Sequence, residues 1–77
     1  MRRRPVIGDS VIYCDHTGTD YHGLCTCDWG TCINILIVRA VGTGYEVASR
    51  TSVVDADRAF KSGSYWRFPD DPVVTFP

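Results

Sequence analysis

Four cysteines and two histidines, the residue types that bind metals or act as nucleophile and base, are gathered in one short stretch of the chain. They are Cys14, His16, His22, Cys25, Cys27 and Cys32, and they span nineteen of the 77 residues. Thiolates and imidazoles are the ligands that zinc prefers, and four of them complete a tetrahedral structural site. One interpretation is therefore a structural zinc site of the four cysteines, with His16 or His22 as alternative ligands.

Two other interpretations of the cysteines stay open. On a strand, Cys25 and Cys27 would point to the same face with Cα atoms about 6.6 Å apart, a geometry that suits two metal-bound thiolates better than a disulfide. The usual Cys-x-x-Cys chelate spacing is absent, however, and free cysteine is often buried as a small apolar residue. The alternatives are thus buried thiols, or a disulfide such as Cys14 with Cys25 or Cys27.

Catalysis is not expected from these residues. A Cys–His nucleophile pair needs a third group that orients the base, and no such group or oxyanion loop is recognisable here. The sequence also has no Gly-rich phosphate loop, carboxylate pair or Ser/His/Asp set. We therefore expect no enzyme and no cofactor apart from the zinc alternative.

Short β-strands separated by turns must position the cysteines. Alternating or β-branched residues predict strands over 6–14, 21–27, 32–40, 45–48 and 51–54, with turn formers between them. The strands over 21–27 and 32–40 form a hairpin. Residues 55–61 are the only segment with helical character, and they predict at most one turn. This pattern indicates an all-β fold of about five strands, a small barrel or sandwich.

Length and charge exclude several classes of partner. A chain of 77 residues forms one domain and leaves little room for a large internal active site. Of its eight basic residues three are Arg2, Arg3 and Arg4, which leaves five against nine acidic ones. Nucleic-acid binding needs many basic contacts on one face, and the longest apolar run is too short to span a bilayer. We expect a soluble protein made in a cytoplasm, with neither nucleic acid nor membrane as partner.

Both ends of the chain carry residues suited to a protein partner. We predict a basic arm over 1–5, a barrel over 6–68 and a proline-rich extended tail over 69–77. The predicted partner-binding residues are basic, aromatic or aliphatic, the types that dominate interface energies: Arg2, Arg3, Arg4, Trp29, Tyr65, Trp66, Phe68, Val73, Val74 and Phe76. Alternatively, the basic arm is simply solvated and the tail lies on its own barrel. In a further alternative Trp66 is needed to close the core, and in that case Trp29, in a turn, is the better exposed candidate.

The order of several short motifs resembles a known group of proteins. The motifs are Gly8–Tyr13, His22–Thr26, Cys32–Val38 and the closing Tyr65–Pro69. In this order they are similar to small accessory proteins of tailed phages that infect actinobacteria, whose closing aromatic pair is partly matched by Trp66 and Phe68. The resemblance implies an SH3-like small β-barrel, and no established activity transfers with it.

In the context of such a phage, a small acidic-to-neutral barrel with apolar, proline-rich termini is expected to have a structural role in the virion. We expect a capsid decoration (cement) protein or another head–tail component, made in the host cytoplasm and located in the virion. It would bind capsid or other virion subunits, or further copies of itself. The alternative is a host-directed phage module that binds and inhibits a host or defence protein.

Overall fold

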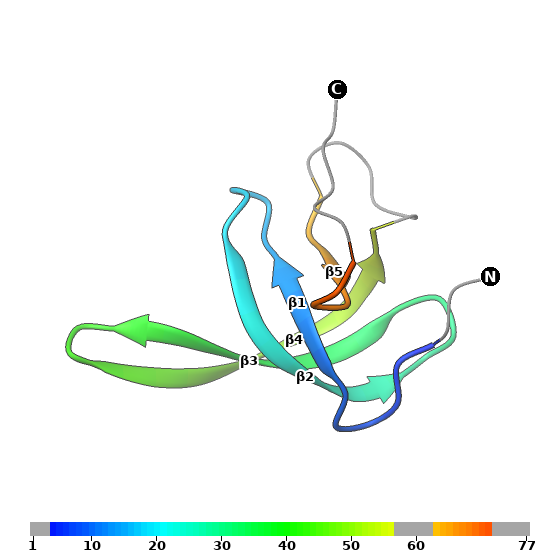
Figure 1. Cartoon of the computed structure of the whole chain (residues 1–77), viewed down its shortest axis with the longest axis horizontal. Helices are drawn as coiled ribbons and strands as arrows, with labels where there is room; N and C mark the ends of the chain where they lie inside the picture. Colours follow the sequence, from blue (N-terminus) through cyan, green and yellow to red (C-terminus); the bar gives the residue numbers. More distant parts are fainter. Residues whose placement is uncertain (1–3, 57–62, 72–77) are drawn as a thin grey trace.

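The computed structural model describes residues 4–56 and 63–71, which form one closed five-stranded β-barrel (Figure 1). The strands are β1 (Ser10–Cys14), β2 (Asp20–Asp28), β3 (Ile33–Val41), β4 (Gly44–Asp55) and β5 (Tyr65–Arg67). The predicted all-β, SH3-like barrel of about five strands is thereby confirmed. The predicted helical turn over 55–61 lies mostly outside the described residues.

The strands follow one another around the barrel in sequence order. Neighbours from β1 to β4 pair antiparallel, as short connections require. The short β5 closes the ring, because it pairs antiparallel with β1 through Tyr13 and Trp66 and parallel with β4 through Asp55 and Trp66. The aromatic run near the end of the chain is therefore the strand that joins the two sides of the sheet.

The core is filled by alternate residues of the strands. Its members are apolar side chains that point inward: Val11, Tyr13, Cys25, Ile33, Ile35, Ile37, Val53, Trp66 and Phe68. The indole ring of Trp66 and the ring of Phe68 meet edge to face, with centroids 5.1 Å apart, an arrangement that aromatic pairs prefer. These two rings make the closing strand and the residue after it part of the core.

The first strand is shorter than predicted. Residues 6–9 form a turn in which the Asp9 carboxylate accepts a hydrogen bond from the Val6 amide, while the Asp9 amide donates to the Val6 carbonyl. Gly8 has a φ of 93° in this turn, a conformation that glycine adopts without steric cost. Because of this turn, β1 begins at Ser10.

The fourth strand is longer than predicted and reaches beyond the barrel. The two short strands expected over 45–48 and 51–54 are one strand of twelve residues. Ser52 interrupts it with a φ of 56°, close to the register shift between Ile33 and Ile35 of β3. The hairpin end of β3 and β4 projects away from the barrel (Figure 1), so both of its faces are accessible.

Candidate protein-binding surface

The outer face of the sheet carries a continuous row of apolar side chains across β2, β3 and β4. We call these residues the outer strip: Leu24, Leu36, Val38, Tyr45 and Val47. Directly paired residues of antiparallel strands share a face, and the register pairs Leu24 with Leu36 and Val38 with Val47. Tyr45 lies two positions from Val47 on the same strand and therefore points the same way.

Four of the five residues of the outer strip are exposed although they are apolar, and the fifth, Leu36, is half-buried. Val38 is 45% exposed, Val47 is 62% exposed and Tyr45 is 80% exposed. Single exposed apolar residues are normal on protein surfaces, but contiguous ones usually mark an interaction site. The outer strip is thus the strongest candidate for a functional surface among the described residues.

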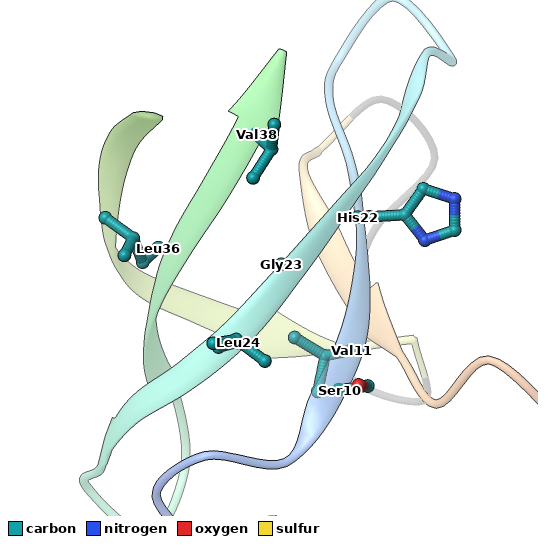
Figure 2. Close-up of a pocket in the computed structure, with 7 residues that line it drawn as sticks. All are labelled: Ser10, Val11, His22, Gly23, Leu24, Leu36 and Val38. Carbon is teal, nitrogen blue, oxygen red and sulfur yellow. The ribbon is translucent and has the colours of Figure 1, made fainter. Parts of the chain in front are cut away.

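Figure 2 shows a hollow beside the outer strip, formed by residues of β1, β2 and β3. Its volume is about 210 Å³, and it is lined by Ser10, Val11, His22, Gly23, Leu24, Leu36 and Val38. Small-molecule sites are usually about 300–1,000 Å³, so the hollow is small for a metabolite. It suits one or two apolar side chains of a protein partner.

The opposite face of the projecting hairpin has a different character. Arg39 and Glu46 face each other across β3 and β4, and the Nε atom of Arg39 donates to Oε1 of Glu46 at 2.5 Å. Val41 is on this face too and is 48% exposed. The hairpin therefore presents a neutral apolar side and a side that carries a paired charge.

The four cysteines do not form a common site. Cys14 and Cys25 are buried, Cys27 and Cys32 are half-buried, and all four are free. Within the described ranges, no three His, Cys, Asp or Glu side chains are arranged to hold a metal ion. A register shift between Cys25 and Cys27 interrupts the regular alternation of β2 on which their predicted same-face placement is based.

Burial determines the acid–base properties of the two inner thiols. It raises the pKa of the Cys14 thiol and of the Cys25 thiol above the ordinary value. Cys14 lies opposite Tyr65 in the β1–β5 pairing. Burial first, and then the hydrogen bond with Cys14, raises the pKa of Tyr65 to about 12. These thiols are therefore protonated at neutral pH, the form that is least reactive as a nucleophile or metal ligand.

The predicted partner-binding residue Arg4 makes contacts within its own chain. Its guanidinium donates to the Asp28 carboxylate, with Nη2 and Oδ1 2.5 Å apart, and lies 3.8 Å from the Asp55 carboxylate. It also lies over the Trp66 ring, 6.0 Å from the centroid. Hydrogen bonding to Asp28 raises the pKa of Arg4 and lowers the pKa of Asp28. Arg4 thus links the residues before β1 to the last residues of β2 and β4.

The predicted aromatic anchors occupy two kinds of environment. Tyr65, Trp66 and Phe68 are buried, with Trp66 only 1% exposed, so they are not part of the accessible surface. Trp29 is 63% exposed in the β2–β3 turn, where its indole N–H donates to Asn34 at 3.1 Å. The other predicted partner-binding residues lie outside the described residues: Arg2, Arg3, Val73, Val74 and Phe76.

The outer strip was missed by the sequence interpretation, although β3 contains a signal for it. A sheet covered on one side alternates apolar and polar residues, whereas Ile35 to Val38 is apolar at every position. The inward residues fill the core, whereas the outward Val38 is exposed and the outward Leu36 is half-buried. Without the strand register, this run reads simply as a buried strand.

Comparisons with known proteins find no relative of this chain. No protein-family model, no curated protein and no solved structure matches the chain.

Within the described residues, no helix is both long and apolar enough to cross a membrane.

Proposed function

We propose that this chain is a protein-binding structural component of a tailed-phage particle, of the capsid decoration or head–tail class. The outer strip is the observation that carries the proposal. The order of the sequence motifs supplies the phage context. In this proposal the protein acts by binding a neighbouring subunit and catalyses no reaction.

The arrangement of the outer strip supports a protein as its partner. Leu36 and Val38 lie on a strand whose other face is fixed by three core isoleucines, so their positions are rigid. A rigid surface loses little conformational entropy when a partner binds. The row also extends from the hollow beside Gly23 to Tyr45 on the projecting hairpin, and this length suits a flat protein surface better than a compact ligand.

A particle provides the setting in which such a small surface is sufficient. A few exposed aliphatic side chains and one tyrosine give a weak single contact compared with a standard interface of about 800 Å² per partner. A symmetric shell repeats the contact many times, and repeated contacts raise the overall avidity. The closed barrel would act as a rigid body that presents the hairpin to the neighbouring subunit.

The proposal is tested by quantifying peptides of this chain in purified particles of the phage whose genome encodes it. A virion component is expected in many copies per particle, at a fixed ratio to the major capsid protein. Absence from purified particles, with abundant protein in infected cells, would contradict the proposal. That result would favour the host-directed binding module instead.

A further inference from the structure

Within residues 4–56 and 63–71, the projecting part of β4 has one open edge. On one side, β4 pairs with β3 from Gly44 to Val53. On the other side, its described partner β5 meets only Val54 and Asp55. Among the described strands, the segment 44–52 therefore has a neighbour on one side only. The backbone groups of such an edge are available to pair with a strand of another chain.

The edge lacks the features by which proteins usually block strand addition. The segment Gly44–Ser52 contains neither proline nor lysine. Its two charged residues, Glu46 and Arg50, are four positions apart and have opposite signs. Residues at even spacing on a strand lie on the same face. A strand that pairs favourably with this edge should therefore carry the same two charges in reverse order.

We propose that two copies of this chain associate by antiparallel pairing of β4 with β4, about a two-fold axis at Ala48. In this register Glu46 of each copy lies opposite Arg50 of the other. The same strand in reverse direction supplies the reversed charge order that the edge requires. The proposal concerns the isolated protein and does not depend on the virion assignment.

Symmetry and charge together select this register. In a two-fold antiparallel pair, the residue at the axis lies opposite its own copy. An axis at Glu46 or at Arg50 would place two like charges opposite each other, which destabilises a sheet. An axis at Val47 or Ser49 would leave both charges opposite neutral residues. Ala48 alone among these positions produces two pairs of opposite charge.

Existing contacts leave both charged groups able to make the new pairs. The Glu46 side chain is 44% exposed, and its carboxylate has further acceptor capacity beyond the bond from Arg39. The Arg50 guanidinium donates to the Ser49 carbonyl at 2.9 Å and lies 5.8 Å from the Tyr13 ring centroid. With five N–H groups in all, it retains donors for a carboxylate. The short side chain at Ala48 leaves room at the axis.

Pairing in this way would also enlarge the apolar surface. Residues opposite each other share a face, so Val47 of one copy would lie beside Ser49 of the other on the outer side. The outer strips of the two copies would then lie on one continuous sheet. A partner of the dimer would meet twice the apolar area that one chain presents.

Charge variants of the full chain test the pairing by sedimentation equilibrium over a range of concentrations. The wild-type chain is expected to dimerise reversibly. Arg50→Glu places two carboxylates opposite each other at both ends of the pairing, and it should raise the dimer dissociation constant roughly tenfold or more. The double variant Arg39→Glu/Glu46→Arg keeps the ion pair within each hairpin but places two guanidinium groups opposite each other between the copies, so it should weaken the dimer similarly.

The triple variant Arg39→Glu/Glu46→Arg/Arg50→Glu separates the proposal from simple misfolding. It restores opposite charges both within each hairpin and between the two copies, so dimerisation should return. Circular dichroism of each variant reports whether the barrel is folded. A wild-type chain that stays monomeric at all concentrations, or a folded triple variant as weak as Arg50→Glu, would overturn the proposal.

Disulfide cross-linking tests the position of the axis. Directly opposed residues in an antiparallel pair have Cα atoms about 4.5–5.5 Å apart, within the range of a disulfide. Ala48→Cys should therefore cross-link two copies on mild oxidation. Ser49→Cys is the matched control, because position 49 does not meet itself, and the wild type gives the background from its native cysteines. Equal cross-linking of Ala48→Cys and Ser49→Cys would contradict the proposed register.

Discussion

The carbonyl oxygen of Leu36 lies 2.8 Å from the position that a Cβ atom at Gly23 would occupy. A side-chain methyl of Ile35 is equally near, at 2.7 Å. No Cβ atom fits so close to a backbone oxygen, so β2 and β3 can approach each other here only because residue 23 is glycine. Gly23 is also one of the residues that line the hollow beside the outer strip.

Gly23→Ala should therefore destabilise the barrel. Overpacking of this kind costs roughly 1–3 kcal/mol, because the backbone must shift. The measurement is urea denaturation of the variant and the wild type. Gly44→Ala is the matched control: nothing lies within 4 Å of its Cβ position, so its unfolding midpoint should change little. Equal midpoints for Gly23→Ala and the wild type would contradict this packing.

Ser52→Gly should stabilise the protein. Ser52 has a φ of 56°, a left-handed conformation that costs a residue other than glycine roughly 1–2 kcal/mol. Its amide donates to Asn34 Oδ1 at 3.1 Å, and glycine retains this hydrogen bond. We expect a gain of roughly 0.5 kcal/mol after the extra entropy of glycine in the unfolded chain. The measurement is the thermal unfolding midpoint of each variant and of the wild type. Ser49→Gly is the control: the φ of Ser49 is ordinary, so glycine at this position should lower the midpoint.

Alkaline pH should destabilise the barrel through Tyr65. Its folded pKa of about 12 lies above its ordinary value of 10.0, so its contribution to stability is complete below about pH 10 and is lost as the pH rises through 12. By pH 11 the loss is about 1 kcal/mol. The raised pKa of the Cys14 thiol acts in the same direction from about pH 9. The measurement is the urea midpoint of the wild type and of Tyr65→Phe from about pH 8 to pH 11. The difference between the two midpoints should shrink as the pH rises. Parallel curves would contradict this role.

The thiols should differ in their reaction with a soluble disulfide reagent. Half-buried Cys27 and Cys32 are expected to react in the native state, whereas buried Cys14 and Cys25 should react only on unfolding. A Cys27→Ser/Cys32→Ser variant should lack the fast phase. If all four thiols were protected and a chelator made them reactive, that result would favour the zinc interpretation instead.

The strand content could be predicted from the sequence because alternation and turn residues determine it locally. The register could not, since it depends on pairings between distant residues. One such feature is the bulge between Cys25 and Cys27, where Cys25 is buried and Cys27 is half-buried. The sequence marked Trp66 as a residue that is buried either in the core or against a partner. Which of the two holds depends on where β5 joins the barrel. The outer strip depends on the same long-range pairing.

In the proposed function, the outer strip binds a neighbouring protein in a phage particle. Val38→Lys and Val41→Lys test it as a matched pair, because the two valines have similar exposure, 45% and 48%, and lie on opposite faces of β3. The measurement is the number of copies of each variant in purified particles, relative to the major capsid protein. We expect a large loss of copies for Val38→Lys and a near wild-type number for Val41→Lys. Equal incorporation of both folded variants would contradict it.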